Sequence, residues 1–254
     1  MIYNDLKGKT ALITGASSGL GKRFAEILSE YGVRVILAAR NIEKLKNIAN
    51  NLNNAIALQM DVSDKESVQN AFKSLKQEKI DICINSAGIG GLTPIFEEDF
   101  ENNFEKIMQI NTMGVWYVTK ASVNHMKNKN INGSIINISS VRGHDKLKEN
   151  VSAYCASKAA VTQMSKALVG ELSKYNIRIN VISPGLFDTE LTRYKLNSQE
   201  EKDSWAKLIP TGFVAKPNNL DGILLYLASN EASKYVTGSC FTIDGGSSCV
   251  SNNI

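Results

Sequence analysis

The stretch Thr14-Gly15-Ala16-Ser17-Ser18-Gly19-Leu20-Gly21 decides the fold. It follows the apolar run Thr10–Thr14 and leads into Leu20–Tyr31, a segment with the apolar spacing of an amphipathic helix. Glycines let such a turn reverse sharply and let backbone N–H groups come close to an anion, and the following helix adds the positive end of its dipole. Glycine spacing alone is weak evidence, but a glycine loop between a strand and a helix is the context in which a pyrophosphate binds.

Short apolar runs alternate with longer amphipathic segments along the rest of the chain. The runs are Thr10–Thr14, Val33–Ala38, Ala55–Met60, Ile80–Ile84, Ser134–Ser139, Ile177–Ile182 and Cys240–Ile243. They are almost continuously apolar, which is typical of parallel strands buried on both faces. The helical segments are Leu20–Tyr31, Ile42–Leu52, Lys65–Gln77, Phe100–Lys127, Ser152–Tyr175 and Asn219–Ala228. This alternation predicts an α/β fold, with residues 1–254 forming a single doubly wound Rossmann-type domain whose seven-stranded parallel sheet carries helices on both faces.

Residues 186–213 interrupt the alternation after the sixth strand. Material after the carboxyl end of a strand lies where ligands bind in open α/β sheets. We therefore interpret this segment as a substrate-side flap, and the alternative is a surface excursion. Its apolar residues are Leu186, Phe187, Leu191, Tyr194, Leu196, Trp205, Leu208 and Ile209.

Composition excludes several classes of protein. The 254 residues are 43% hydrophobic, and 29 basic residues are interspersed with 25 acidic ones for a net charge of +4, which does not favour a nucleic-acid partner. The chain has neither a signal-peptide pattern nor an apolar run of the roughly 18 residues that a membrane span needs. Its four cysteines have neither zinc spacing nor the density of a disulfide scaffold. We expect a cytoplasmic protein with reduced thiols and without a membrane partner.

The glycine loop has the spacing Gly-x-x-x-Gly-x-Gly, which differs from the Gly-x-Gly-x-x-Gly of ordinary dinucleotide dehydrogenases. In this the chain resembles the short-chain dehydrogenase/reductase family, and the resemblance covers essentially the whole chain. The other matching segments are Asn85-Ser86-Ala87-Gly88, Asn111, Ser140, Tyr154-Cys155-Ala156-Ser157-Lys158, Pro184-Gly185, Thr237-Gly238 and Asp244-Gly245-Gly246. One departure is Ser86, where the family usually has a second Asn. We expect cofactor binding to be retained because Asn85, Ala87 and Gly88 are present.

Tyr154 and Lys158 are four residues apart on a predicted helix, so both side chains can reach one site. A free Tyr has a pKa of about 10, and a neighbouring ammonium favours its phenolate form. The resemblance implies that Tyr154 is the general acid for carbonyl reduction and the base for alcohol oxidation. It also implies that Lys158 binds the nicotinamide ribose and lowers the pKa of Tyr154.

The resemblance adds two more catalytic residues. Ser140 would donate a hydrogen bond to the substrate oxygen, and Asn111 would hold a water in a proton relay with Lys158. Ser139 is the competing serine, but a strand alternates its faces and so only one of the two can point into the site; the family pattern favours Ser140. No metal is expected, because His125 and His144 have no partners at ligand spacing.

The end of the second strand predicts the cofactor. An NAD-specific site needs a carboxylate about 20 residues beyond the glycine loop, and Ala39 stands there, 18 residues after Gly21. The next residue, Arg40, is suited to a 2′-phosphate, so NADP(H) is expected; the alternative is that Arg40 is a solvated strand-end charge. The residues expected to bind the cofactor are Gly15, Ser17, Ser18, Gly19, Leu20, Gly21, Arg40, Asp61, Val62, Asn85, Ala87, Gly88, Tyr154, Lys158, Pro184, Gly185 and Thr189.

The expected function is NADP(H)-dependent interconversion of a small-molecule carbonyl and a secondary alcohol. The alternatives are a 3-oxoacyl-[acyl-carrier-protein] reductase, which the segment Ile89–Pro94 counts against, and a non-catalytic dinucleotide-sensing protein. Arg142, His144 and Lys146 offer contacts for an anionic or polyhydroxy substrate, but the sequence does not identify it. The resemblance also implies a homo-oligomer, a tetramer or a dimer, paired through Phe100–Lys127 and Ser152–Tyr175.

Overall fold

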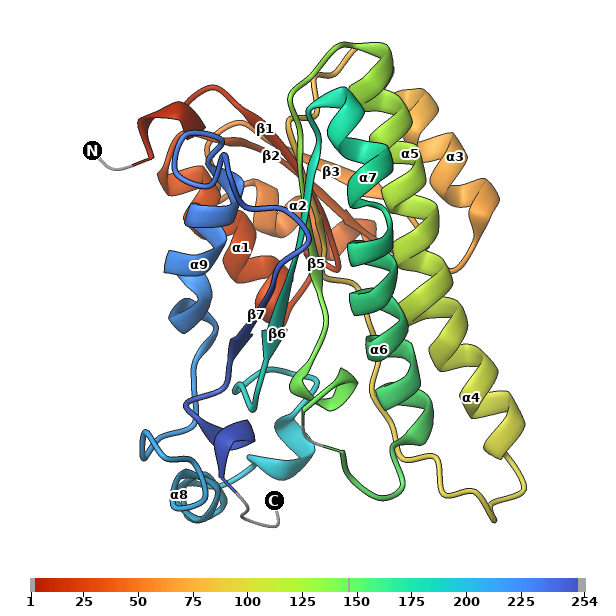
Figure 1. Ribbon diagram of the computed structural model, residues 1–254, viewed down its shortest axis with the longest axis vertical. Helices are drawn as coiled ribbons and strands as arrows, with labels where there is room; N and C mark the ends of the chain where they lie inside the picture. Colours follow the sequence, from red (N-terminus) through yellow and green to blue (C-terminus); the bar gives the residue numbers. More distant parts are fainter. Residues whose placement is uncertain (1–2, 146, 251–254) are drawn as a thin grey trace.

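The computed structural model describes residues 3–145 and 147–250. Seven parallel strands form one sheet in the order β3-β2-β1-β4-β5-β6-β7 (Figure 1). The strands are β1 (Thr10–Thr14), β2 (Arg34–Ala39), β3 (Ala55–Gln59), β4 (Ile82–Asn85), β5 (Ser134–Ile138), β6 (Arg178–Pro184) and β7 (Cys240–Ile243). The chain builds the sheet outward from β1 in one direction and from β4 in the other. The predicted doubly wound α/β fold is confirmed, and its topological switch point lies between β1 and β4.

Helices cover both faces of the sheet (Figure 1). On one face lie α1 (Gly19–Glu30), α2 (Ile42–Ala49) and α9 (Asp221–Ala228), and on the other lie α3 (Lys65–Ser74), α5 (Gly114–Asn128) and α6 (Ser152–Ala167). The core is correspondingly divided in two. Ile13 of β1 packs with the α1 and α9 side, whereas the adjacent Leu12 packs with the α3 and α5 side. This division follows from the alternation of side chains along a strand.

The long helix expected at Phe100–Lys127 contains an interruption that sequence periodicity did not predict. It consists of α4 (Phe100–Met108), a π-helical turn (Gln109–Met113) and α5. The backbone N–H of Gly114 donates to Gln109 O, five residues back. The turn carries Asn111, which is completely buried. Such turns occur mostly as single bulges in α-helices and are frequent at functional sites.

The other expected helices end close to their predicted positions. The segment expected at Ser152–Tyr175 is helical throughout, but it passes through Leu168 into the short α7 (Val169–Leu172) and then a 3₁₀ turn. Helix α2 ends at Ala49 rather than Leu52, and Asn54 in the turn that follows has a left-handed backbone. Among residues 3–145 and 147–250, none of the helices has the length and apolar character needed to cross a membrane.

The segment 186–213 contains structure of its own. It includes a 3₁₀ turn (Arg193–Lys195) and α8 (Gln199–Ala206), a helix that the sequence analysis did not predict. Helix α8 begins with a capping box, in which the Ser198 side chain accepts from Glu201 N and the Glu201 carboxylate accepts from Ser198 N. This pairing satisfies two N–H groups at the start of the helix. Its low apolar content hid the helix from a search for apolar periodicity.

Candidate active site

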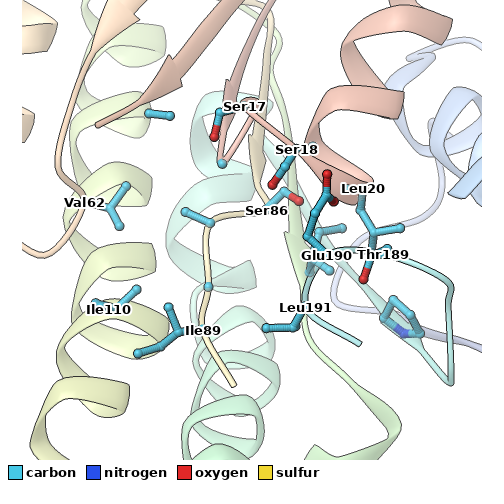
Figure 2. A pocket seen from close by; sticks show the side chains of 18 of the residues that line it. Ser17, Ser18, Leu20, Val62, Ser86, Ile89, Ile110, Thr189, Glu190 and Leu191 are labelled. Atoms are coloured by element: carbon cyan, nitrogen blue, oxygen red, sulfur yellow. The ribbon is translucent and has the colours of Figure 1, made fainter. Parts of the chain in front are cut away.

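A cavity of about 370 Å³ lies at the carboxyl ends of the strands, next to the switch point. Figure 2 shows side chains from the glycine loop, from Val62 and Ile110, and from residues 189–191 around it. Most of the residues expected to act in the site line this cavity. They are Gly15, Ser17, Ser18, Gly19, Leu20, Gly21, Arg40, Asp61, Val62, Ala87, Gly88, Ser140, Tyr154, Lys158, Pro184, Gly185 and Thr189.

The glycine loop has the conformation that a phosphate site requires. Gly15 and Gly19 have φ angles of +67° and +51°, which L side chains rarely adopt. A Cβ on Gly15 would lie 2.8 Å from Ala87 N, and one on Gly21 would collide with the carbonyl oxygen of Gly15. The Ser18 side chain makes no capping bond to α1, and its hydroxyl lies in the cavity. The loop thus presents backbone amides and a helix N-terminus, and these fit the pyrophosphate of a dinucleotide.

Sequence reasoning did not find Glu190, which lines the cavity beside this loop. Its Oε2 lies 3.5 Å from the position that a Cβ on Gly19 would take, and Figure 2 shows its side chain next to Ser18 and Leu20. The positive end of the α1 dipole favours a carboxylate there. Glu190 therefore competes for the part of the site that fits a phosphate. No motif marks this residue, because the approach depends on how the segment after β6 folds back over α1.

The far end of the cavity is formed after β2 and β3. Ala39 ends β2 and Arg40 follows it with an exposed side chain, so no carboxylate stands at the end of this strand. The Asp61 carboxylate accepts from Ser63 N at 2.9 Å and from Ser63 Oγ at 2.7 Å. These bonds position Asp61 and Val62 at the cavity wall.

Asn85 does not reach the cavity with its side chain. It is 1% exposed, and its Nδ2 donates to Thr119 Oγ1 at 3.0 Å and to Asn137 Oδ1 at 2.8 Å. It thus ties β4 to β5 and α5. Ser86 stands where the family usually has Asn, and the structure uses only its backbone to position this loop. The backbone N–H groups of Ser86 and Ala87 both donate to Thr14 Oγ1 at 3.1 Å. The loop after β4 is positioned by these backbone bonds, which do not use the Ser86 side chain.

Tyr154 and Lys158 lie one turn apart on α6 and face the cavity. Lys158 Nζ is 5.8 Å from the centroid of the Tyr154 ring, and it donates to Ile138 O at 2.9 Å. This bond holds the ammonium group against the end of β5. Because Lys158 is only 5% exposed, burial lowers its pKa from 10.5 to about 8.

The protonation of Tyr154 is governed by groups other than the one expected. Burial raises the pKa of Tyr154, and the Ser140 hydrogen bond and the Arg142 charge partly offset that effect. The resemblance implies that Lys158 lowers this pKa, but Lys158 is not among the groups that shift it. The phenol therefore stays protonated at neutral pH, which is the form that donates a proton to a carbonyl.

The two serines at the end of β5 have different partners. The Ser139 hydroxyl lies 2.8 Å from Lys158 O and 2.8 Å from Thr162 Oγ1, so it bonds to α6. Ser140 Oγ accepts from Arg142 N at 3.2 Å and is hydrogen-bonded to Tyr154. This arrangement favours Ser140 over Ser139 as the serine beside the reacting oxygen.

Asn111 is brought close to the site without lining the cavity. Its Oδ1 accepts from Ile89 N at 2.8 Å, and its Nδ2 donates to Ile89 O at 2.9 Å and to Ser157 Oγ at 3.1 Å. Both Nδ2 hydrogens are thus used in holding Ile89 and α6. The expected role in holding a water stays a prediction.

The remaining candidates are placed as follows. His144 Nε2 lies 3.2 Å from Cys240 Sγ, and its Nδ1 lies 3.5 Å from Asp145 Oδ2, so this ring is engaged at the β7 edge rather than in the cavity. Arg142 lies within electrostatic reach of Tyr154. Lys146 falls outside the described residues. Within the described part of the chain, no group of three or more His, Cys, Asp or Glu side chains is arranged to hold a metal ion.

Comparison with known proteins identifies the family. A family model described as enoyl-(acyl carrier protein) reductase matches residues 15–248. The chain therefore belongs to the short-chain dehydrogenase/reductase family of oxidoreductases, which use nicotinamide cofactors.

Individual relatives differ in cofactor and substrate. An NAD-dependent glycerol dehydrogenase of Listeria innocua is 36% identical, with 95% of this chain and 94% of that protein aligned. An NADP-dependent (R)-specific alcohol dehydrogenase of Lentilactobacillus kefiri is 34% identical, with coverages of 95% and 97%. The structure of a gluconate 5-dehydrogenase from Burkholderia cenocepacia J2315 in complex with NADP and tartrate is 31% identical, with a TM-score of 0.89 and coverages of 98% and 100%.

We predict that Lys158→Met changes how stability depends on pH. Burial lowers the pKa of Lys158 to about 8, so between that value and 10.5 the unfolded chain binds a proton that the folded protein lacks. The free energy of unfolding of the wild type therefore rises with pH in this window. Between about pH 7 and about pH 9.5, the free energy of unfolding of the wild type should rise by about 2 kcal/mol relative to that of Lys158→Met.

Urea unfolding of both proteins at the two pH values measures this difference. Lys166→Met is the matched control, because Lys166 is an exposed lysine on the same helix. A pH dependence that is the same in all three proteins would show that Lys158 is charged throughout the range in the folded state.

Proposed function

We propose that the protein is an NADP(H)-dependent oxidoreductase that interconverts a carbonyl and a secondary alcohol, with Tyr154 as general acid and base. The observation that carries the proposal is that Tyr154, Ser140 and Lys158 line the same cavity as the glycine loop. A nucleotide held at the loop and a substrate at Tyr154 would share one enclosed space. Of the reported relatives, two have names that describe alcohol oxidation by a nicotinamide-dependent enzyme.

Each residue has a role that its contacts support. When bound, the nicotinamide supplies a hydride to the carbonyl carbon or accepts one from the alcohol carbon. In reduction, Tyr154 donates its phenolic proton to the substrate oxygen, and in oxidation its phenolate accepts that proton. Ser140, whose Oγ accepts from Arg142 N and whose hydroxyl is hydrogen-bonded to Tyr154, donates its hydroxyl hydrogen to the same oxygen when the substrate lies beside both residues. Lys158, anchored on Ile138 O, has further N–H groups that would hold the nicotinamide ribose.

We further propose that residues 186–213 form a flap on the substrate side of the cavity. Phe187, Thr189, Glu190, Leu191 and Thr192 all line it. Leu191 packs close to Gly90 in the loop that follows β4, since a Cβ on Gly90 would lie 3.4 Å from Leu191 Cδ1. The segment thus encloses the space over the loop that follows β4.

A 3-oxoacyl-[acyl-carrier-protein] reductase is the second candidate, and a protein of that name from Rickettsia prowazekii is 34% identical to this chain. A dinucleotide-binding protein without turnover is the third. The two enzymatic candidates are separated by a substrate panel of sugars, polyols, steroids and 3-oxoacyl thioesters, followed by the absorbance of NADPH. Absence of turnover across the panel, with NADPH still bound, would favour the third.

We predict that Tyr154→Phe lowers turnover by about 10²–10⁴-fold, because the variant keeps the ring and loses the proton that general acid catalysis transfers. Affinity for NADPH should change little. Turnover of the best panel substrate and a fluorescence titration with NADPH measure the two effects. Tyr175→Phe, at an exposed tyrosine outside the cavity, is the control. Retention of most of the activity in Tyr154→Phe would mean that another group is the acid.

We predict that Arg40→Ala weakens NADPH binding and leaves NADH binding nearly unchanged. A hydrogen bond from a charged group contributes about 1.5–3 kcal/mol, which corresponds to about ten- to a hundred-fold in affinity. The reported relatives include one NAD-dependent and one NADP-dependent enzyme, so the two cofactors need direct comparison. Paired titrations of the wild type, Arg40→Ala and the control Lys44→Ala, at an exposed residue of α2, provide it. Equal affinity of the wild type for both cofactors would refute the assignment.

We also propose that the chain forms a homo-oligomer, a tetramer or a dimer, through the faces of α5 and α6 that lie away from the sheet. Val115 and Val161 are buried, whereas Trp116 and Met164 on the same helices are only partly covered. A mass of one 27.8 kDa chain by light scattering at micromolar concentration would refute this.

A further inference from the structure

Three basic residues from two separate segments, Arg142, Lys148 and Lys195, lie close enough for their charges to interact. Arg142 and Lys148 belong to the connection between β5 and α6, and Lys195 belongs to the 3₁₀ turn after β6. Lys148 Nζ and Lys195 Nζ lie 5.6 Å and 5.9 Å from the centroid of one ring, that of Trp205 in α8. We refer to Arg142, Lys148 and Lys195 as the cation cluster.

The positive charges of this cluster oppose one another. Burial is the main cause that lowers the pKa of Lys148, and the charges of Lys195 and Arg142 lower it further. In the part of the chain that the structure describes, neither Lys148 nor Lys195 forms an ion pair with a carboxylate. The aromatic contacts of the two lysines, with Trp205 and Tyr194, stabilise a cation without neutralising it.

Three carboxylates of the neighbouring flap are engaged elsewhere. Asp188 pairs with Lys202 at 2.6 Å, Glu201 accepts from Asn197 N and Ser198 N, and Asp203 accepts from Gln199 Nε2. The flap thus brings Lys195 toward two other cations, and these three acids have different partners. A concentration of like charge is an arrangement typical of sites that bind the opposite charge.

The cluster is continuous with the proposed reaction centre. The backbone N–H of Arg142 donates to Ser140 Oγ at 3.2 Å, and the Arg142 charge acts on Tyr154. Tyr194, whose ring lies 5.0 Å from Lys195 Nζ, also acts on Tyr154. A substrate with its carbonyl at Tyr154 and Ser140 would therefore have the cluster within reach of its other end.

We propose that the substrate is a small carbonyl or alcohol bearing a carboxylate or phosphate group, which binds Arg142, Lys148 and Lys195 while Tyr194 and Trp205 pack against its carbon chain. This inference rests on the proposed function for the reacting end, and it adds the chemical class of the substrate. Arginine and lysine donate charge-assisted hydrogen bonds to either anion, so both sources share one chemistry. Neutral sugars and steroids carry no charge with which Lys148 and Lys195 could pair, and we expect them to be poor substrates.

Trp205 reports binding at the cluster without any turnover. The chain has two tryptophans, so Trp116→Phe leaves Trp205 as the only indole. This protein is titrated with D-gluconate, D-fructose 6-phosphate and neutral D-fructose while indole fluorescence is recorded. We expect a saturable change with at least one of the two anions and none with fructose, and the responding anion shows whether carboxylate or phosphate is preferred.

Charge removal then tests the assignment of residues. In the same background, Lys148→Gln and Lys195→Gln should each weaken binding of the responding anion by about tenfold. Lys207→Gln, at an exposed lysine just after α8, is the matched control and should leave it unchanged. No response to either anion, or equal weakening by all three substitutions, would overturn the proposal.

Kinetics separate this proposal from the proposed function. With an anionic substrate that turns over, Lys148→Gln and Lys195→Gln should raise KM about tenfold with kcat largely retained, because they remove binding distant from the reacting carbon. Binding of an anion at Trp205 without turnover of any carbonyl or alcohol would contradict the proposed function and leave the anion site standing. Efficient turnover of neutral substrates without anion binding would contradict the anion site alone.

Discussion

The backbone of Gly15 lies directly against the backbone of Ala87, and the rest of the site depends on this contact. A Cβ on Gly15 would come within 2.8 Å of Ala87 N and Cα. Thr14 Oγ1, one residue earlier, accepts from the N–H groups of Ser86 and Ala87 and so fixes the distance between the two segments. The contact joins the first strand–helix unit to β4, where the sheet changes its direction of growth. Any side chain at Gly15 would separate the phosphate loop from the reaction centre.

The reaction centre is built from polar groups that are buried at a cost to stability. Lys158 is 5% exposed and Ser140 is 7% exposed. Ser140 follows the fully buried strand β5, and the Lys158 ammonium reaches the end of that strand from α6. Burial of the ammonium disfavours its charged form, and its bond to Ile138 O compensates for only part of the lost hydration. The surrounding sheet supplies the rigidity that keeps these groups in place, because β5 is paired on both sides, with β4 and β6.

Most of the fold was predictable because its signals are local and repeated. Each buried parallel strand is a nearly continuous apolar run, and the glycine loop marks the first crossover, so strands and long helices were placed within a few residues. That Ser139 and Ser140 face different ways was also accessible from the alternation of side chains along β5, whereas the choice of Ser140 came from the family resemblance. Helix α8 was missed because its stability comes from a polar capping box and not from an apolar stripe. Three features of the site depend on tertiary packing that no spacing encodes: the Asn85 amide bonded to Thr119 and Asn137, the raised pKa of Tyr154, and the approach of Glu190 to α1.

The position of Asn111 depends on the exact number of residues in the π-helical turn at Gln109–Met113. A π turn contains one residue more than an α turn, so it is geometrically a single-residue insertion in a continuous helix. Each residue of an α-helix turns the chain by about 100°. Loss of one residue between Met108 and Gly114 would let α4 and α5 merge into one regular helix, and one of the two flanking helices would rotate by that angle about its axis. Asn111 would then leave Ile89 and Ser157, or α5 would expose the residues that it packs on the sheet. The loss of a single residue would therefore disturb the site from within this helix, although nothing in the composition of Gln109–Met113 distinguishes it from its neighbours.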